Sequence, residues 1–371
     1  MYVNTLGVWG GVATYLMPII KEQVNLGNEV YLVVGNQGEL TNNVQKNIPE
    51  VKIIFLDTMQ REIKPLSILK SIFKFRKLVK DLKPNIIHLN CIMAGLIGRI
   101  GSLFLKSKIV YNAHGWAFEP GTSKKYKWPA IIIEKILSYC TDAIICVSNY
   151  EKKIADKYSI FKKDNQAIVI KNASRDFGLS HNKIRPKDGS FTVTMSARFW
   201  EQKNQLLLIK GFEKFINRYR EKNQFKLYLL GDGPKLNECK EYVKNHNMEK
   251  FIEFTGMVNN VDEYYFKSDV VALITNYDAI AISLIEGLSM SKPLIATNTC
   301  GVPENFYEDF SNGCCINNTV SDIDIALNYL FSNPEIRRQM GELSRKLYER
   351  DFKIEKNISL HNNLYENLLK K

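Results

Sequence analysis

Short runs of β-branched and aromatic residues alternate with helix-length amphipathic segments along nearly all of the 371 residues. Strands that are separated by helices run parallel, so this alternation predicts parallel sheets built from strand–helix–strand units. The predicted strands of the first half are Tyr2–Thr5, Val30–Val34, Lys52–Leu56, Ile86–Leu89, Ile109–Asn112, Ala143–Val147 and Ala167–Ile170. The pattern restarts in the second half with strands at Phe191–Ala197, Lys226–Leu230, Phe251–Thr255, Val270–Thr275 and Leu294–Thr297.

A polar stretch over residues 171–189 separates the two patterns and is typical of a connector between domains. We therefore predict an α/β protein with two Rossmann-like parallel-sheet domains, over residues 1–177 and 190–352. The last segment, 353–371, is predicted to be a helix that crosses back and packs on the first domain. Ligands of such sheets bind at the carboxyl ends of the strands, so two domains that face a cleft would place a ligand there.

The composition is that of an ordinary globular chain, with 45% hydrophobic and 24% charged residues, which excludes disorder and fibres. No apolar run approaches the roughly 20 residues that span a bilayer, and the N-terminus lacks the features of an export signal. We therefore expect a cytoplasmic protein. The seven cysteines form no Cys-x-x-Cys pair and the five histidines no His-Glu-x-x-His motif, so we expect reduced thiols and no zinc site.

Positive charge is concentrated in the first half. Residues 1–180 hold 25 Lys and Arg against 14 Asp and Glu, a net charge of +11, whereas residues 181–371 hold 26 against 25. A basic half favours an anionic partner, such as nucleic acid, anionic lipid or a phosphorylated acceptor. The alternative is a globular protein that is simply basic, without such a partner. The amphipathic segment 64–83 carries seven cations and one acid; it either lies on anionic lipid or covers its sheet with the cations in water. A second basic-aromatic cluster consists of Lys124, Lys125, Lys127 and Trp128.

Two cations follow the first strand of the second half, in the segment 196–204. Arg198 and Lys203 lie before a predicted helix, whose free backbone amides and dipole also attract anions. Arginine grips a phosphate through two N–H groups, and lysine supplies a compact charge. The segment therefore suits a phosphate or a diphosphate. The alternative is that both cations are simply solvated at a helix start.

Glycines open two further strand–helix junctions. Gly231 lies in the turn Leu229–Pro234, where Gly-Asp-Gly permits strained backbone geometry and the close approach of a ligand, although an isolated Gly-x-Gly indicates no more than a turn. Gly10 and Gly11 precede the first predicted helix and allow close backbone contact with a phosphate. They lack the Gly-x-Gly-x-x-Gly spacing, which argues against a dinucleotide site.

The segment 275–293 carries two acids eight residues apart. Asp278 lies in the loop after a strand, and Glu286 lies one turn inside a helix that is predicted to begin near Ile282. Both carboxylates are expected to meet a single ligand. Glu286 has apolar neighbours, and its burial there is costly unless a group such as a ribose hydroxyl donates a hydrogen bond to it. The alternative is that Glu286 caps the backbone of its own domain.

In this order and spacing the segments resemble the retaining glycosyltransferases of family 4, which have the two-domain GT-B fold. The resemblance spans nearly the whole chain. Its motifs are Trp9–Gly11, Pro84–His88, Ala113–Gly115, Val147–Ser148, the segment 196–204, Leu230–Pro234, Phe254–Val258, Lys292–Ala296 and Gly301–Glu304.

The resemblance implies that Arg198 and Lys203 bind the diphosphate of a nucleotide-sugar donor and that Glu286 accepts hydrogen bonds from the ribose. Asp278 matches the first acid of the family's Glu-x7-Glu motif but is one methylene shorter, and alanines replace the flanking glycines. The contact with the donor sugar is therefore where this chain departs from the family. His114 matches the histidine near the reacting sugar. The implied catalytic residues are Asp278, His114, Arg198 and Lys203. The implied donor-binding residues are Gly11, Arg198, Lys203, Gly231, Val258, Asp278, Ile282, Ser283 and Glu286.

The implied reaction is a metal-independent hexose transfer that retains the anomeric configuration, through same-face attack assisted by a phosphate oxygen of the leaving group. The implied donor is a UDP-sugar, or else a GDP-sugar. The implied acceptor is a saccharide on a polyprenyl diphosphate at the anionic inner face of the membrane, in the assembly of surface polysaccharide such as capsule or O-antigen. No cofactor is expected. Asp322-Ile323-Asp324 spells Asp-x-Asp, but it lies at a predicted helix start, where acids favour the dipole, so no metal is expected.

Two other functions are compatible with parts of the sequence. A nonhydrolysing sugar-nucleotide epimerase shares the two-domain architecture, but it needs acid–base groups at C2 of the sugar in place of an acceptor site. A nucleic-acid-binding protein would use the basic half, but no helix-turn-helix, zinc pattern or aromatic-basic repeat is present. We therefore expect no nucleic-acid partner.

Overall fold

The computed structural model describes residues 1–60, 62, 64–120, 122–178, 190–219 and 225–370. The chain forms two compact units. The first unit comprises Met1–Asn172 with Glu355–Lys371, and the second comprises Ala173–Ile354. Most of the predicted connector, including His181, lies outside the described residues.

The boundary between the units differs slightly from the predicted one. Residues 173–177, predicted within the N-terminal domain, belong to the second unit. They do so because the Ser174 N–H donates to the Phe352 carbonyl at 3.3 Å. The Phe177 N–H likewise donates to the Ser289 hydroxyl at 3.4 Å.

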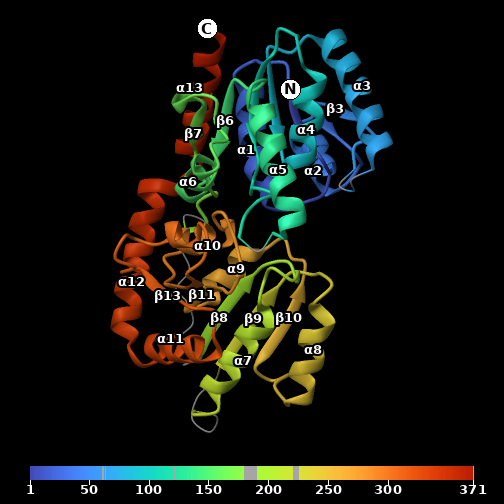
Figure 1. Cartoon of the computed structure of the whole chain (residues 1–371). Coiled ribbons are helices and arrows are strands. Elements are labelled where there is room, and N and C mark those ends of the chain that lie inside the picture. Colours follow the sequence, from blue (N-terminus) through green and yellow to red (C-terminus); the bar gives the residue numbers. More distant parts are fainter. Residues whose placement is uncertain (61, 63, 121, 179–189, 220–224, 371) are drawn as a thin grey trace. The chain divides into compact units, whose positions relative to one another are not determined.

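The first unit contains a seven-stranded parallel sheet in its described residues, in the order β3-β2-β1-β4-β5-β6-β7. Figure 1 labels β3, β6 and β7 of this sheet. Its strands are β1 (Tyr2–Asn4), β2 (Tyr31–Val34), β3 (Lys52–Phe55), β4 (Ile86–Asn90), β5 (Lys108–Asn112), β6 (Ala143–Cys146) and β7 (Ala167–Val169). Each strand boundary lies within one residue of the predicted boundary. The strand order reverses where β1 pairs with both β2 and β4, and ligands of such sheets bind at the carboxyl side of this reversal.

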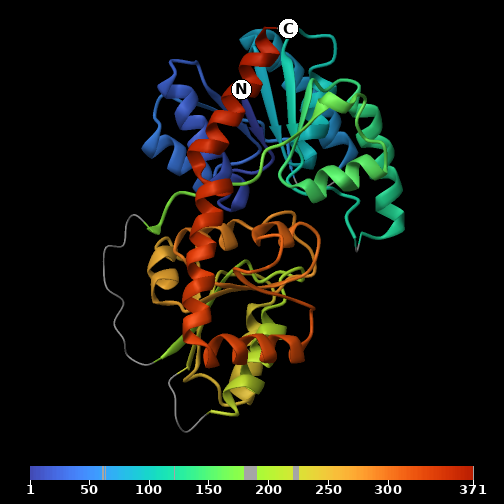
Figure 2. The same cartoon turned by 90° about the vertical axis from the view of Figure 1, so that its left-hand side faces the viewer.

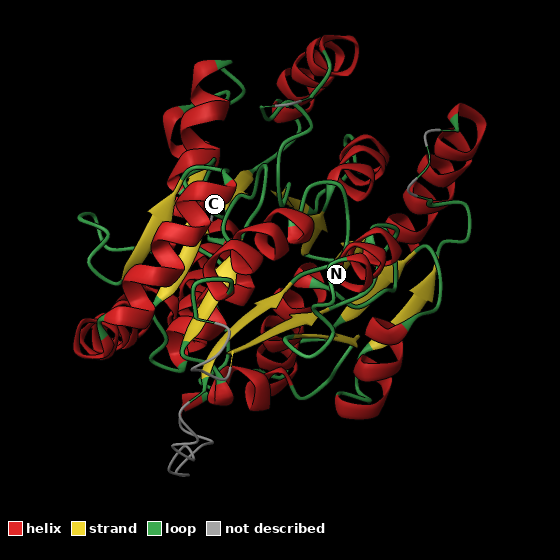
Figure 3. Cartoon of the chain, turned by 90° about the horizontal axis from the view of Figure 1, so that it is seen from below, coloured by secondary structure: helices red, strands yellow, loops and turns green. Residues whose placement is uncertain are grey.

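Helices cover both faces of this sheet (Figures 2 and 3). One face packs against α3 (Pro65–Leu82), α4 (Ile92–Gly101), α5 (Lys124–Ser138) and α6 (Asn149–Lys157). The other face packs against α1 (Gly11–Asn25), α2 (Glu39–Asn47) and the C-terminal helix α13 (Ile354–Leu369). A short 3-10 turn, η1 (Asp164–Gln166), precedes β7. The apolar stripe of α3 contributes the buried Phe75 and Val79 to the core, so this helix does cover its sheet.

The second unit contains a six-stranded parallel sheet in its described residues, in the order β10-β9-β8-β11-β12-β13. Its strands are β8 (Phe191–Ser196), β9 (Phe225–Leu230), β10 (Ile252–Gly256), β11 (Val270–Leu273), β12 (Leu294–Thr297) and β13 (Gly313–Ile316). Its helices are α7 (Gln205–Ile216), α8 (Leu236–Asn245), α9 (Val261–Lys267), α10 (Ile282–Ser289), α11 (Val320–Ser332) and α12 (Pro334–Leu347). A 3-10 turn, η3 (Val302–Asn305), and a π-helical segment, η4 (Tyr348–Phe352), complete it.

One strand of this sheet was not predicted. β13 has the sequence Gly-Cys-Cys-Ile, which lacks the run of β-branched residues that marks the other strands. Pairing with β12 places it at the sheet edge, so tertiary contacts overrule a weak local preference. All seven cysteines lie among the described residues, and all are free thiols. Within the described part of the chain no helix is long and apolar enough to cross a membrane.

Candidate active site

The predicted donor-binding segments lie at one edge of the second unit's sheet. They follow the carboxyl ends of β8, β9, β10 and β11. Because parallel strands end at the same edge of a sheet, these loops are neighbours there although they are far apart in the sequence. The antiparallel bridge between Lys203 and Thr275 joins the loop after β8 to the segment after β11.

The glycine turn after β9 supports the loop that carries Arg198. The Ala197 N–H donates to the Leu230 carbonyl at 2.9 Å. Gly231 has φ of 129°, and a Cβ at this position would lie 2.4 Å from the Ala197 carbonyl oxygen. Only glycine meets both conditions without strain. The turn therefore holds the Arg198 loop in place, a role that the isolated Gly-x-Gly did not reveal.

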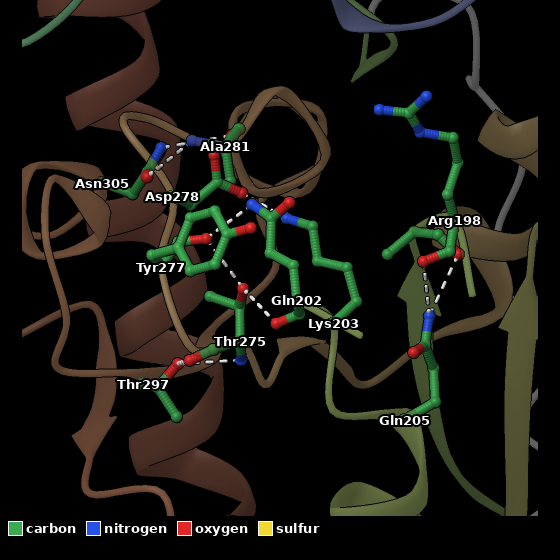
Figure 4. Close-up of polar contacts among 11 residues, drawn as sticks. Arg198, Gln202, Lys203, Gln205, Thr275, Tyr277, Asp278, Ala281, Thr297 and Asn305 are labelled. Atoms are coloured by element: carbon green, nitrogen blue, oxygen red, sulfur yellow. Dashed lines mark hydrogen bonds and ion pairs between the residues drawn. The ribbon is translucent and has the colours of Figure 1, made fainter. Parts of the chain in front are cut away.

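Arg198 and Lys203 leave this loop in different directions (Figure 4). Arg198 is exposed, and its guanidinium carbon lies 5.6 Å from the centre of the Trp200 ring. The Lys203 ammonium forms an ion pair with the Asp278 carboxylate, and the two side chains are only 16% and 20% exposed. The structure thus brings the predicted diphosphate ligand Lys203 together with the predicted sugar-binding acid.

Hydrogen bonds fix the loop that carries Asp278 (Figure 4). The Thr275 hydroxyl lies 3.0 Å from the Gln202 carbonyl oxygen. The Gly301 N–H donates to the Asp278 carbonyl at 2.9 Å, and a Cβ on Gly301 would lie 1.4 Å from the Ala279 carbonyl oxygen. The segment Gly301–Glu304 therefore needs its glycine in order to support the acidic loop.

Glu286 lies one turn inside α10, which begins at Ile282 as predicted. Its Oε2 accepts a hydrogen bond from the Tyr265 hydroxyl at 2.9 Å. Burial raises the pKa of Glu286 to about 7, and the Tyr265 hydrogen bond and the Arg175 charge oppose this shift. The hydrogen-bond partner of this carboxylate is thus a side chain of its own unit, whereas the alternative expected a backbone group there. Tyr265 was not predicted: it lies 21 residues away on α9 and belongs to no motif.

Three further predicted donor contacts lie around the same sheet edge. Ile282 and Ser283 form the first turn of α10, and both are partly exposed. This turn contains no acidic residue, so the positive end of the helix dipole attracts an anion without local competition. Val258, two residues after the end of β10, is partly buried. Their contact with a donor stays a prediction.

Gly11 and His114 lie at the carboxyl edge of the first unit's sheet, Gly11 at the start of α1 and His114 after β5. His114 Nε2 lies 2.9 Å from Asn90 Oδ1, and the His114 N–H donates to Asn112 Oδ1 at 3.1 Å. Burial, with a smaller effect of His361, lowers the pKa of His114 to about 3. The imidazole is therefore neutral near pH 7 and donates its Nε2 hydrogen to the Asn90 amide oxygen.

The Asp-x-Asp acids have structural partners. Asp322 Oδ2 accepts a hydrogen bond from Asn317 Nδ2 at 2.9 Å. Asp324 is buried on α11 and forms an ion pair with Arg218 at 2.7 Å. Among the described residues no group of three His, Cys, Asp or Glu side chains is placed to hold a metal ion.

Two family models match the chain in succession. The first, described as Glycosyltransferase Family 4, matches residues 9–173, and the second, Glycosyl transferases group 1, matches residues 176–347. The chain is 26% identical to the Escherichia coli UDP-Gal:alpha-D-GlcNAc-diphosphoundecaprenol alpha-1,3-galactosyltransferase, over 98% of this chain and 95% of that protein. It is 27% identical to the O-antigen biosynthesis glycosyltransferase WbnH of Escherichia coli, over 92% of each.

Solved structures resemble the chain along its whole length. A glycosyltransferase from Rickettsia africae ESF-5 has a TM-score of 0.81 at 19% identity, covering 100% of this chain and 99% of that one. Anabaena Alr3699/HepE in complex with UDP-glucose has a TM-score of 0.80 at 16% identity, covering 98% of both chains. Together with the two parallel sheets, these likenesses confirm the predicted fold class.

Proposed function

This chain belongs to glycosyltransferase family 4, and on that premise we propose that it transfers a hexose from a UDP-sugar to a lipid-linked saccharide. The relative that uses UDP-Gal with a diphosphoundecaprenol-linked acceptor supports both substrate classes, and the HepE complex with UDP-glucose supports the donor. A GDP-sugar is the second candidate donor. A lipid-linked acceptor assigns the reaction to the assembly of surface polysaccharide, such as capsule or O-antigen.

The observation that carries this proposal is the pairing of Lys203 with Asp278 beside the Arg198 loop. Cleavage of the bond between an anomeric carbon and a phosphate leaves growing negative charge on the diphosphate. Fixed cations at the site of that charge stabilise the transition state more than the ground state. The exposure of Arg198 and the position of the Lys203 ammonium on the same loop support the proposal that both bind phosphate oxygens.

Donor binding must rearrange the Lys203–Asp278 pair. A diphosphate brings a second anion to the ammonium group, and the Asp278 carboxylate is then released toward the polar groups of the sugar. The shorter side chain of Asp278, compared with the family's glutamate, is compatible with this role because its loop is anchored to Gly301. One carboxylate oxygen of Glu286 continues to accept the hydrogen bond from Tyr265, and the other oxygen then accepts one from a ribose hydroxyl.

We assign retention of configuration to same-face attack, in which a phosphate oxygen of the leaving group accepts the proton of the acceptor hydroxyl. Trapping of a glycosyl-enzyme on Asp278 would contradict this assignment. We also propose that the transfer needs neither metal nor cofactor, because the two cations supply the charge. Undiminished transfer in excess chelator is expected, and loss that manganese restores would contradict it.

The acceptor's lipid suggests that the first unit binds an anionic membrane surface. The helix α5 presents Trp128, Ile132 and Ile136 to solvent on one face, with exposed fractions of 54%, 56% and 63%. Residues spaced by four lie on the same side of a helix. Exposed lysines flank this stripe at Lys124, Lys125 and Lys135. An apolar stripe with a lysine border is the pattern of a helix that lies in a membrane interface.

Sedimentation with vesicles tests this membrane role. The chain is expected to sediment with vesicles that contain anionic lipid at low salt, and to remain in the supernatant with neutral vesicles. Replacing Ile132 and Ile136 with Ser is expected to reduce the bound fraction severalfold. The matched change Phe73→Ser on α3, also exposed, is expected to have a smaller effect. Indifference to lipid charge would contradict the proposal.

The transfer itself is tested with a synthetic polyprenyl-diphosphate saccharide and a panel of UDP- and GDP-sugars. Selective binding stabilises the folded protein, so a thermal-shift panel first identifies the donor. We expect one UDP-sugar to raise the melting temperature and to yield a longer glycan on the acceptor. Isomerisation of the donor in the absence of acceptor would indicate an epimerase and contradict the proposal.

A further inference from the structure

A chain of buried polar side chains connects the C-terminal helix α13 to His114. His361 on α13 lies with Nδ1 at 2.7 Å from the Asn357 carbonyl oxygen and Nε2 at 2.5 Å from the Tyr15 hydroxyl. Asn112 Nδ2 donates to the Tyr15 oxygen at 3.1 Å. The Oδ1 of the same asparagine accepts the His114 N–H. Every link lies within the first unit.

The chemistry of the groups fixes the direction of each hydrogen bond. A carbonyl oxygen only accepts, so His361 Nδ1 carries the hydrogen, and the neutral ring then offers a lone pair at Nε2. The Tyr15 hydroxyl must donate to that lone pair. Its oxygen is thereby left to accept from Asn112 Nδ2, which turns Asn112 Oδ1 toward the His114 N–H. The protonation of His361 thus determines the orientation of an amide that holds the backbone of His114.

Burial keeps this arrangement in a single protonation state. His361 and Tyr15 are almost fully buried, and burial lowers the pKa of His361 to about 4. His88 stacks on His361 with ring centres 5.9 Å apart, and burial lowers the pKa of His88 well below its usual value. These rings therefore stay neutral at physiological pH, and the hydrogen-bond directions do not change.

His114 needs such support. Its φ is 52°, in the left-handed region that non-glycine residues rarely adopt. The Tyr15 ring packs edge-on against its imidazole with centres 4.8 Å apart. Tyr15 therefore contacts His114 directly through its ring and indirectly through Asn112. Apolar side chains would fill the same space without the cost of burying polar groups.

We propose that His361 and Tyr15 are positioning residues, which set the orientation of His114 for sugar transfer through Asn112. The proposal rests on the proposed role of His114 at the reacting sugar. The proposal gives the C-terminal helix a function in the reaction. His361 on this helix is about 250 residues further along the sequence than His114, the residue that it positions. Neither residue contacts a reacting atom in this account.

The test compares two variants with the same chemical change. Tyr15→Phe removes the hydroxyl inside the chain of hydrogen bonds. Tyr365→Phe removes another buried hydroxyl, which contacts Tyr2 and His88 but lies outside the chain of hydrogen bonds. We expect Tyr15→Phe to lower kcat by about tenfold with an unchanged KM for the donor, because misorientation of a catalytic group costs turnover and not binding. Tyr365→Phe is expected to keep kcat within about twofold.

His361→Phe is expected to match Tyr15→Phe, because it removes the acceptor of the same hydroxyl. In a His114→Ala background, Tyr15→Phe is expected to have no further effect on residual kcat, as holds for residues that act through one another. If Tyr15→Phe and Tyr365→Phe both lost kcat in proportion to their loss of melting temperature, the cause would be reduced stability. That result would overturn the proposal.

A spectroscopic measurement separates the positioning from the proposed function. The five histidines of the ¹⁵N-histidine-labelled protein are assigned by single His→Gln changes. Tyr15→Phe is expected to shift the ring resonances of His114, and Tyr365→Phe to leave them in place. Unchanged His114 resonances in Tyr15→Phe would overturn the positioning role. If instead the shift occurs but His114→Ala transfers sugar normally, the assigned role of His114 in the reaction fails.

Discussion

The two units hold their site residues by different means. The second unit relies on charged and titratable groups: Lys203 pairs with Asp278, Arg198 is exposed, and burial raises the pKa of Glu286 to about 7. In the first unit, His114 is neutral, and the amide oxygens of Asn112 and Asn90 hold its backbone N–H and its Nε2. A group that stabilises a departing diphosphate must be charged, whereas one that orients a sugar needs hydrogen bonds of constant direction. The comparison therefore predicts different responses to mutation and to pH.

The largest effect is expected from Arg198→Ala. Removing one preorganised charge at a developing anion costs on the order of 10²–10³ in kcat, or about 3–4 kcal/mol. The measurement is turnover at saturating donor. Arg338→Ala is the matched control, because Arg338 is an exposed arginine of the same unit with only surface partners. Near-normal turnover of Arg198→Ala would remove the basis of the proposed role of charge in the second unit.

The second-largest effect concerns substitutions of glycine, which can cost stability through backbone strain alone or through backbone strain together with a steric clash. Gly231 and Gly27 both have positive φ. A Cβ added at Gly231 would clash with the Ala197 carbonyl, whereas a Cβ added at Gly27 would have no atom within 4 Å. We expect Gly27→Ala to cost about 1 kcal/mol of unfolding free energy and Gly231→Ala about 3 kcal/mol. Urea denaturation measures both. Gly231→Ala should also weaken donor binding, and equal stability with full binding would contradict the supporting role of this turn.

The third effect is on pH dependence. In the proposed donor complex Glu286 accepts hydrogen bonds from ribose hydroxyls. An ionised carboxylate accepts such bonds better than the protonated acid does, so donor binding is expected to favour loss of the Glu286 proton. Affinity for a UDP-sugar is then expected to rise by about tenfold from pH 6 to pH 8, across the pKa of about 7, and to level off above it. Titration calorimetry measures this.

The control for the pH effect is Glu286→Gln, which should remove the rise. The first unit should contribute nothing to it, because the pKa values of His114 and His361 are lowered to about 3 and about 4. A rise that persists in Glu286→Gln would indicate that another group titrates on binding.

The smallest effect is expected at Asp278. Asp278→Asn frees Lys203 from its ion pair, so UDP without a sugar should bind about fivefold more tightly, or about 1 kcal/mol. Transfer should fall at the same time, because the acid that is proposed to contact the sugar is lost. Asp232→Asn, an exposed acid on the neighbouring turn, should change UDP affinity less. Weaker UDP binding by Asp278→Asn would show that the ion pair does not compete with the phosphates.

Most of the scaffold was predictable because its signals are local. The start of α10 at Ile282 and the placement of Glu286 one turn inside it follow from helix periodicity. β13 was not predictable, because Gly-Cys-Cys-Ile becomes a strand only through its pairing with β12. Partners that are distant in the sequence were also missed, since no local pattern joins Tyr265 to Glu286 or Tyr15 to His361. The glycine of the β9 turn was found, but its contact with the Arg198 loop required the structure.

The most direct test of the central claim is a crystal structure of the chain with a nontransferable UDP-sugar. The account predicts that oxygens of the diphosphate lie within hydrogen-bond distance of the Arg198 guanidinium and of Lys203 Nζ, and that Asp278 has turned toward the sugar. Phosphates bound elsewhere, with the Lys203–Asp278 ion pair intact, would contradict it.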